Sequence, residues 1–364
     1  MNPAEFISSG RPMATIQQIA EILPHENADL LEIAIIKGWR SIVQKGQFRK
    51  GDKIIFVEID AHIPIDLAPF LGKSQSVKKF NGSDGYVLKT VKLRGVVSQG
   101  LILPLNILRG KNVVQTVGTD VSSVLGIQKY EAPIPTELMG ELAGVFPSWA
   151  RKTDQDRIQA CIDDVFENIK NDQWVIEEKA DGTSMSVMKR GEDIQICGRN
   201  MSFKYGPDDN PNNSIVNAAR FYNVVERLRV YGRNLSINGE LIGPGIQKNI
   251  YELPKTQWVV FDVFDVDSGS YLSIEERLNV LCELNEISDA PKIPIVPLLS
   301  VAHIFEIGEK TKDQLVEEIL GMAEGKTVIG SMKAIREGIV FKSIEHPDVS
   351  FKSIANSKLL KEKD

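Results

Sequence analysis

The feature that most constrains this sequence is a single lysine, Lys179, which follows the apolar stretch 174–176 and precedes the pair Asp181-Gly182. A solvated lysine is protonated at neutral pH and cannot act as a nucleophile. It becomes a reactive amine only where burial removes its water, or where other cations such as a bound metal crowd it. A strand that carries Lys179 out of a core into an Asp-Gly turn would place it on a pocket floor. A hairpin with a chance lysine is the alternative.

Four further segments follow Lys179 in a fixed order, and each has the composition of a strand or of a strand end. They are Arg199-Asn200, 239–245, the acid-interrupted apolar run 259–265, and 337–342 with 350–352. In this order they resemble the motifs of the covalent nucleotidyltransferase superfamily, which contains polynucleotide ligases and capping enzymes. Each motif is short, but the ordered set is specific.

Within this superfamily the chain resembles an ATP-dependent RNA ligase of the fifth family, the Deinococcus/Naegleria type, in which an N-terminal OB module precedes the catalytic domain. The resemblance covers nearly the whole chain. We therefore expect a two-domain fold. An all-β OB-type barrel that binds nucleic acid would occupy residues 1–130, a linker residues 131–150, and an α+β nucleotidyltransferase domain built on antiparallel sheets residues 151–364.

The resemblance implies three successive phosphoryl transfers. Lys179 would attack the α-phosphorus of ATP to form lysyl-adenylate, the AMP would move to a 5′-phosphate, and a 3′-OH would displace it to seal the nick. Catalysis of such steps rests mostly on positioning and charge neutralisation. The cofactors would be ATP and Mg²⁺ or Mn²⁺, and the partner would be RNA or an RNA-containing nicked duplex.

The same resemblance assigns roles to the strand-end residues. Glu337 and Asp181 would hold the metal, because Mg²⁺ needs only one or two carboxylates and keeps several waters. Lys342 and Lys352 would act as catalytic cations beside Lys179 and neutralise the α-phosphate. The rest of the ATP site would be formed by Glu178, Gly182, Arg199, Glu240 and Phe261. Phe261 is expected to stack on adenine, and an ordinary core aromatic is its alternative.

The N-terminal part has the turn-rich pattern of a small β-barrel. Strands are predicted at 34–36, 40–43 and 53–57, and one alternating, half-buried strand at 86–93. The candidate nucleic-acid contacts of this part are Lys78, Lys79, Lys89, Lys92 and Arg94. Solvated strand faces are the alternative for these side chains. Arg157 is a further candidate phosphate contact, and a helix-surface charge is its alternative.

Helices are predicted only in the C-terminal part. Apolar residues spaced three or four apart predict one core-facing helix over 213–230. Capping boxes at 273–276 and 311–314 predict two more. Asp154 is expected to cap a fourth helix, just after the linker.

Bulk properties agree with this organisation. A chain of 364 residues with 42% hydrophobic content can bury a large core in two domains. The net charge of −6 excludes a protein that coats nucleic acid by bulk positive charge, so contacts must come from local basic patches. The three cysteines are too far apart for a disulfide framework or a zinc site. Neither a secretory signal at residues 1–5 nor a membrane-spanning run is found, so we expect a soluble intracellular monomer, cytoplasmic or nuclear.

Two other functions stay open. A DNA ligase or capping guanylyltransferase often has arginine two residues after the glycine of the lysine motif, where this chain has Ser184. A non-catalytic OB-type nucleic-acid-binding protein would need the barrel but not the ordered lysines and glutamates. One departure concerns the last motif: many ligases have Lys-x-Lys there, but this chain reads Lys352-Ser353-Ile354, so Lys358 is the candidate for the second cation.

Overall fold

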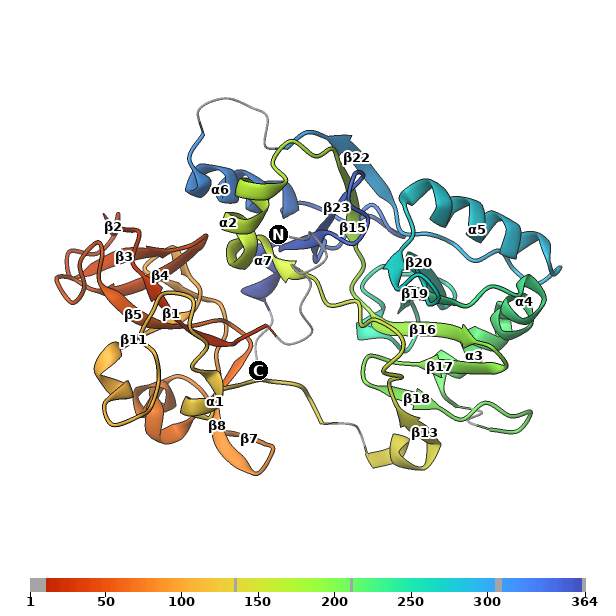
Figure 1. Ribbon diagram of the computed structural model, residues 1–364, viewed down its shortest axis with the longest axis horizontal. Helices are drawn as coiled ribbons and strands as arrows, with labels where there is room; N and C mark the ends of the chain where they lie inside the picture. Colours follow the sequence, from red (N-terminus) through yellow and green to blue (C-terminus); the bar gives the residue numbers. More distant parts are fainter. Residues whose placement is uncertain (1–10, 134–135, 210–211, 305–309, 362–364) are drawn as a thin grey trace.

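The computed structural model describes residues 11–133, 136–209, 212–304 and 310–361. Figure 1 shows an N-terminal β-module (β1 to β12) beside a C-terminal region (β13 to α7) that holds the longer helices. The predicted fold class is confirmed: the first part is all-β apart from short helical turns, and the second is α+β on mostly antiparallel sheets. Within these ranges, no helix combines the length and apolarity that crossing a membrane requires. Residues 1–5 and 134–135 of the predicted organisation lie outside the described residues.

The N-terminal β-module consists of small antiparallel sheets around a core that includes Ile16, Ile55 and Ile63. One sheet contains β1 (Ala14–Gln18), β5 (Lys53–Val57) and β11 (Leu101–Pro104), and a second contains β2 (Glu21–Pro24), β3 (Leu31–Ile36) and β4 (Trp39–Gln44). A third contains β12 (Gln128–Lys129), β6 (Ala61–Pro64), β8 (Ser83–Val87) and β7 (Lys78–Phe80). The hairpin of β9 (Val91–Leu93) with β10 (Val96–Ser98), the helix α1 (Ser122–Leu125) and short 3₁₀ turns complete the module.

The predicted strands at 34–36, 40–43 and 53–57 are confirmed as parts of β3, β4 and β5. The single strand predicted at 86–93 is wrong. The chain leaves β8 after Val87, buries Leu88 in the core, and starts β9 at Val91 in a different sheet. Alternation of apolar and polar residues predicts the pleat but carries no information on a change of pairing partner.

The C-terminal region contains a seven-stranded antiparallel sheet with helices packed on it. Its strands, in spatial order, are β13 (Leu142–Val145), β18 (Met201–Phe203), β17 (Asp193–Cys197), β16 (Thr183–Arg190), β19 (Leu235–Ile242), β20 (Gln257–Asp265) and β21 (Ser270–Tyr271). The helices α3 (Ser214–Phe221), α4 (Val224–Tyr231) and α5 (Ile274–Glu286) share its hydrophobic core. Because β13 pairs with β18, part of the predicted linker 131–150 is a strand of this sheet.

The single helix predicted at 213–230 is wrong, because two helices occupy this segment. Asn213 caps α3 by accepting from the backbone N–H groups of Ile215 and Val216. The chain then breaks at Asn223, whose φ of 49° is left-handed, before α4 begins. Asparagine tolerates this conformation better than other non-glycine residues, and the apolar spacing runs through the break unchanged.

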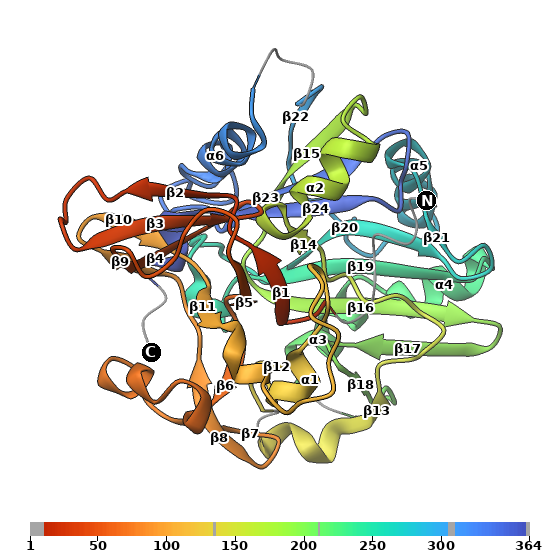
Figure 2. The same cartoon turned by 60° about the vertical axis from the view of Figure 1, so that its left-hand side comes forward.

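The second sheet of the C-terminal region has five strands. They are β14 (Asp156–Arg157), β24 (Ser350–Ile354), β23 (Gly338–Ser343), β15 (Trp174–Lys179) and β22 (Leu298–Ala302), of which β14 and β24 run parallel. The helices α2 (Ile158–Asn168) and α6 (Lys312–Ala323) share its core, and α7 (Asn356–Leu359) follows β24. In Figure 2, α2 and α6 lie beside this sheet and next to the N-terminal β-module. Both predicted capping boxes are confirmed, at the starts of α5 and α6.

The turn 180–182 joins the two sheets of the C-terminal region. β15 ends at Lys179 in the five-stranded sheet, and β16 begins at Thr183 in the seven-stranded sheet. The strand registers place Lys179 opposite Gly338 and Ser184 opposite Glu240. At Gly182 an added Cβ would lie 2.2 Å from the carbonyl oxygen of Leu241, so the crossing is too tight for any other residue. The register thus brings distant motifs to one place.

Candidate active site

A cavity of about 350 Å³ lies where the two C-terminal sheets meet. Most of the predicted nucleotide-site residues line it: Glu178, Lys179, Gly182, Arg199, Glu240, Phe261, Lys342 and Lys352. Asp181 and Glu337 are not part of this lining. Asp181 directly precedes Gly182, which lines the pocket, and Glu337 accepts a hydrogen bond from Lys179. Residues from at least five strands therefore contribute to one pocket, as a site built at strand ends requires.

Carboxylates surround Lys179 on the floor of this pocket. Its Nζ donates to Glu337 Oε2 at 2.8 Å, and its side chain is 25% exposed. Burial by itself disfavours the ammonium, but Glu337, Glu240 and Asp181 outweigh it, so the pKa of Lys179 lies above its ordinary value. Of the two expected routes to a reactive amine, burial and nearby cations, burial is therefore not enough by itself. A cation that neutralises the carboxylates is needed to favour the free amine.

Glu240 shows the same crowding from the carboxylate side. Burial, with help from Glu337 and Asp181 and against the opposing effect of Lys179, raises the pKa of Glu240 to about 8. Its Oε1 accepts from the backbone N–H of Gly182 at 3.1 Å. Two or more acids that repel one another in a buried site form a donor set that a divalent cation would relieve.

The donor set fits Mg²⁺ or Mn²⁺, but it is not a closed metal cage. Among the described residues, no group of three or more histidine, cysteine, aspartate or glutamate side chains is arranged to hold a metal ion by itself. Mg²⁺ in nucleotide sites uses one or two carboxylates together with phosphate oxygens and water, so such a cage is not required. The two predicted ligands are both engaged here, Glu337 by Lys179 and Asp181 by Lys358.

Lys358 supplies a cation that the last motif lacks. It comes from α7 and forms an ion pair with Asp181, two residues after Lys179. Ile354 occupies the place of the second lysine of a Lys-x-Lys pair and is buried. The structure thus brings Lys358 to the site, and its partner there is a carboxylate.

Lys342 lines the pocket, but acids already hold its ammonium. Its Nζ lies 2.9 Å from Glu177 Oε2 and 2.7 Å from Asp262 Oδ1, and it also donates to the carbonyl of Phe261. Arg277 joins this buried network through Glu177 and the same carbonyl. Although burial raises the pKa of the Glu177 carboxyl, the two cations more than compensate, so that it lies below its ordinary value. Each charge in this network therefore has an opposite charge beside it.

Lys352 is the opposite case, a pocket cation with no hydrogen bond or ion pair to the described part of the chain. Burial, reinforced by Arg157 and Lys179, lowers the pKa of Lys352 to about 7. Arg157 lies beside it in the parallel register of β14 and β24, and its Nη1 is buried without a hydrogen-bond partner among the described residues. Lys352 and the Nη1 of Arg157, which is unpaired in the described part of the chain, therefore offer two adjacent cationic donors to a phosphate.

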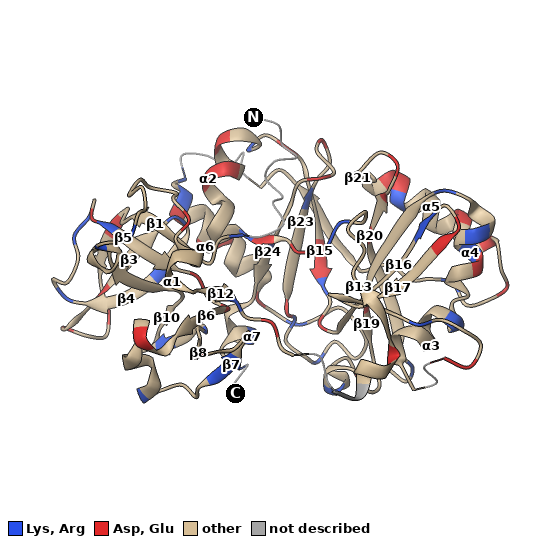
Figure 3. Cartoon of the chain, turned by 60° about the horizontal axis from the view of Figure 1, so that its bottom comes forward, with Lys and Arg blue, Asp and Glu red and all other residues tan. Residues whose placement is uncertain are grey.

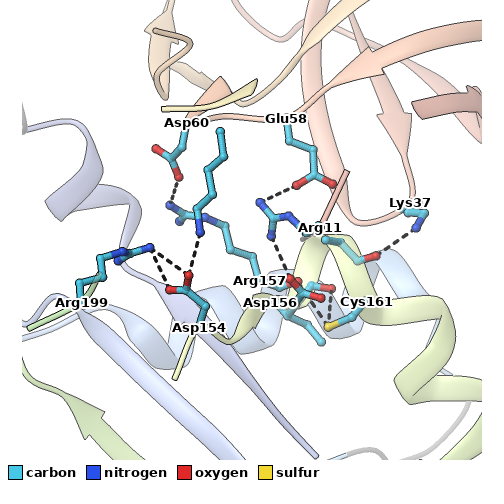
Figure 4. A network of polar contacts seen from close by, with 12 residues as sticks. Arg11, Lys37, Glu58, Asp60, Asp154, Asp156, Arg157, Cys161 and Arg199 are labelled. Carbon is cyan, nitrogen blue, oxygen red and sulfur yellow. Dashed lines mark hydrogen bonds and ion pairs between the residues drawn. The ribbon is translucent and has the colours of Figure 1, made fainter. Parts of the chain in front are cut away.

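Arg157 is neither on a helix surface nor on the basic face of the N-terminal β-module. It is 7% exposed and binds Asp60 of that module with a distance of 3.0 Å between Nη2 and Oδ2. Figure 4 shows this pair next to a second one, in which Arg11 lies between Glu58 and Asp156. The alternative of a helix-surface charge is thus wrong, and Arg157 joins the two parts of the molecule.

Asp154 does not cap α2, whose N-cap is Arg157 without a side-chain bond. Its carboxylate accepts from Arg199 at 2.9 and 3.0 Å and from Lys129 at 3.0 Å, and Figure 4 shows the paired oxygens facing Arg199. Although burial opposes the shift, these cations lower the pKa of Asp154 to about 2. Its position before a helix predicted a cap, but the carboxylate binds Arg199 and Lys129, which are distant in the sequence.

Two more predicted residues have partners that the sequence did not indicate. The Glu178 carboxylate accepts from the Thr327 hydroxyl and from the Val328 N–H at 2.8 Å, so both of its oxygens already have partners within the protein. Phe261 is half-buried on the pocket wall, with Lys342 Nζ at 5.8 Å from its ring centre. Phe261 is thus on the pocket wall instead of in the centre of a core.

Sequence reasoning missed Glu177, Arg277 and Tyr251. Glu177 carried a signal, because an acid inside an otherwise apolar strand needs a buried partner. Arg277 lies on an amphipathic helix, and nothing nearby in the sequence distinguishes it from a surface arginine. Tyr251 is 1% exposed, and its hydroxyl accepts from the Asp181 N–H at 2.6 Å. It lies in an irregular segment, so only the tertiary structure reveals this contact.

The predicted nucleic-acid contacts of the N-terminal β-module are spread over β7, the segment after β8, and the β9–β10 hairpin. In Figure 3 the blue part of β7 lies near α7. Lys78, Lys89 and Lys92 share a groove there, whereas Lys79 and Arg94 do not line it. The cluster is therefore separate from the nucleotide pocket.

Comparisons with known proteins agree with this geometry. A family model described as RNA ligase matches residues 172–354, and one described as an OB-fold domain matches residues 13–105. No curated protein sequence gives a significant match.

Solved structures of the Naegleria gruberi RNA ligase are similar over almost the whole chain. An apo mutant of that ligase is 35% identical with a TM-score of 0.85, and the match covers 98% of this chain and 100% of that one. The same ligase with pyrophosphate is 36% identical with a TM-score of 0.83, over 97% and 99%. A mutant with AMP and Mn is 36% identical with a TM-score of 0.84, over 97% and 100%. This chain belongs to the RNA ligase family.

Proposed function

We propose that the protein is an ATP-dependent RNA ligase that joins a 3′-OH to a 5′-phosphate through lysyl-adenylate and an adenylated RNA 5′-end. The observation that carries this proposal is Lys179 on the pocket floor, crowded by three carboxylates, in the same cavity as Lys352, which is unpaired among the described residues. A binding protein has no use for a buried lysine held by acids, and the family match covers this domain.

In the first step, the Lys179 amine forms a bond to the α-phosphorus of ATP, and the bond to pyrophosphate breaks. The lysine loses a proton, and pyrophosphate leaves with the electron pair. Bound Mg²⁺ or Mn²⁺ would neutralise the floor carboxylates and the phosphate oxygens. We assign Glu337 and Asp181 as the residues that hold the metal or its waters, because they flank Lys179 and share its charge.

The remaining residues position the nucleotide. We assign Lys352 to the phosphates, with Arg157 beside it. We assign Lys342 to the same phosphates, where its ammonium would keep its contacts with Glu177 and Asp262. Arg199 would contact the ribose or a phosphate, Glu240 would contact the ribose hydroxyl, and Phe261 would stack on adenine. Glu178 and Gly182 shape the floor, since one is fixed by Thr327 and the other permits the tight crossing.

In the later steps, the 5′-phosphate of RNA takes AMP from Lys179, and the 3′-OH then displaces AMP and closes the phosphodiester. We propose that the region 1–130 is the module that holds the RNA or nicked duplex, that 131–150 connects it, and that 151–364 performs the chemistry. Support comes from the basic cluster Lys78, Lys79, Lys89, Lys92 and Arg94 on the OB-fold region. We also propose that the protein acts as a monomer. Its three cysteines are free thiols, which supports the proposal that it works in a reducing compartment.

The test is to incubate the protein with α-labelled ATP or GTP and a divalent cation, and to run a denaturing gel. Label retained from ATP, followed by sealing of a nicked RNA duplex, is the expected result. Retention from GTP alone would indicate a capping enzyme. No retention from either nucleotide would overturn the proposed activity.

A further inference from the structure

A second cavity of about 740 Å³ forms a groove apart from the nucleotide pocket. One wall belongs to the N-terminal β-module and carries Lys78, Lys89 and Lys92, with Leu93 beside them. The other wall is Leu359 and Leu360 at the end of the chain's last helix. None of the described residues that line it is an acid. On a chain of net charge −6, such a lining is a local site for an anion.

The short helix α7 connects this groove to the reactive lysine. Its Lys358 forms the ion pair with Asp181, while the next residue, Leu359, lines the groove. Asn356 accepts from Gln99 of the N-terminal β-module at 3.2 Å, and the N–H of Ser357 donates to Glu324 of the segment after α6 at 3.1 Å. Each residue of α7 thus contacts a different part of the molecule. Leu359 in the groove directly follows Lys358, which contacts the active site.

We propose that this groove holds a single strand of the RNA substrate, with its phosphates on the three lysines and its sugars and bases over the apolar wall. The inference rests on the proposed ligase function and narrows its nucleic-acid site to Lys78, Lys89 and Lys92. Basic grooves with apolar walls are how single strands are held without sequence preference. The volume is that of a small-ligand pocket, which admits a few nucleotides of one strand, whereas a duplex is recognised over a broad surface.

The groove and the active site share α7. Leu359 lines the groove and its chain neighbour Lys358 pairs with Asp181, so we expect a strand bound against Leu359 to have its end near Lys179. Lys79 and Arg94 belong to the same basic cluster but are outside the groove, on neighbouring exposed positions. Substituting Lys79 and Arg94 therefore tests whether RNA binds in the groove or on the whole basic face.

The first experiment compares double variants with equal loss of charge. Lys78→Ala/Lys92→Ala removes groove lysines, Lys79→Ala/Arg94→Ala removes cluster residues outside it, and Lys45→Ala/Lys50→Ala removes exposed turn lysines of the same module. Binding of a fluorescent single-stranded RNA is measured by anisotropy over about 50 to 200 mM salt. In the groove variant, the slope of log affinity against log salt should fall by about 1.4, or 0.7 per contact. The turn variant should behave as wild type.

If Lys79→Ala/Arg94→Ala weakens single-strand binding as much as the groove variant, the whole face is the site and the groove is not. The groove is equally overturned if the groove variant binds single-stranded RNA like wild type, or if it loses only duplex binding. Lysyl-adenylate formation from labelled ATP is measured on every variant, because none of these residues lines the nucleotide pocket. Normal adenylation shows that the variant is folded.

The second experiment keeps the lysines and changes the wall. Leu93 in the groove and Leu278 on α5 are both 41% exposed, so Leu93→Glu and Leu278→Glu make the same change at matched positions. Leu93→Glu should weaken single-strand binding about fivefold by repulsion of the phosphates, and Leu278→Glu should not. Equal binding by the two variants would overturn the groove.

Failure of the groove differs from failure of the ligase assignment. If wild type seals nicked RNA and the groove variants bind and seal equally well, only the groove is wrong. If wild type forms no lysyl-adenylate, the proposed function itself fails, whatever the binding results.

Discussion

The floor of the nucleotide pocket and the side that carries Lys352 have opposite electrostatics. On the floor, Lys179 is surrounded by Glu337, Glu240 and Asp181, and its pKa is raised. On the other side, Lys352 lies beside Arg157 without an acid partner of its own among the described residues, and its pKa is lowered to about 7. The floor therefore lacks a cation and the Lys352 side lacks an anion. A metal–triphosphate complex would supply both in one ligand.

The largest expected effect follows from replacing the floor lysine. Lys179→Ala and Lys179→Arg should both abolish lysyl-adenylate formation, by at least about 10³-fold, since a guanidinium stays protonated and cannot attack phosphorus. Retention of label from α-labelled ATP on a denaturing gel measures this. Thermal unfolding close to that of wild type is the control, and substantial label on either variant would contradict the role of Lys179.

The next effect concerns the floor acids. Glu337→Gln should slow adenylation by about 10²-fold and raise the Mn²⁺ concentration that gives half the maximal rate, while ATP binding changes little. The two views of this acid predict opposite signs. If Glu337 served only to hold Lys179 protonated, its loss would speed the reaction, so a faster variant or an unchanged metal requirement would refute metal binding by Glu337.

The side of the pocket that carries Lys352 is tested by proton uptake. The pKa of Lys352 is about 7 in the free protein, so its side chain is mostly neutral at about pH 8.5. A bound polyphosphate should favour the protonated ammonium. Binding of ATP without a divalent cation should then take up close to one proton, and affinity should weaken as the pH rises above 7 by up to about tenfold per pH unit. Calorimetry in buffers of different ionisation enthalpy measures the uptake. Lys352→Met keeps the apolar stem and should abolish it, and equal uptake by the variant would show that another group titrates.

The smallest effect should come from the support of the floor. Tyr251→Phe removes the acceptor of the Asp181 N–H and leaves a buried donor unpaired, which costs about 1–3 kcal/mol of the free energy of unfolding. Urea denaturation measures this loss. Adenylation should fall less than tenfold, because no charge at the floor is removed. A loss as large as that of Glu337→Gln would mean that Tyr251 does more than hold the turn.

Local signals in the sequence predicted the elements well where the signal was itself local. The capping boxes at the starts of α5 and α6 use contacts three residues apart, and both are present. The signal for Lys179 at a strand end is also local, since an apolar run followed by Asp-Gly predicts a strand that ends in a turn. The breaks at Asn223 and after Val87 were missed because hydrophobic periodicity continues across them.

The sequence by itself determined which side chains could take part: the ordered lysines and glutamates, the tight glycine after Asp181, and the basic residues of the N-terminal part. Only the tertiary structure decided their partners. Lys342 binds Glu177 and Asp262, Arg157 binds Asp60, and Lys358 binds Asp181. These partners are 80 or more residues apart in sequence. Strand register and domain packing bring them together, and Coulomb interactions act over a few ångströms of space whatever the separation along the chain.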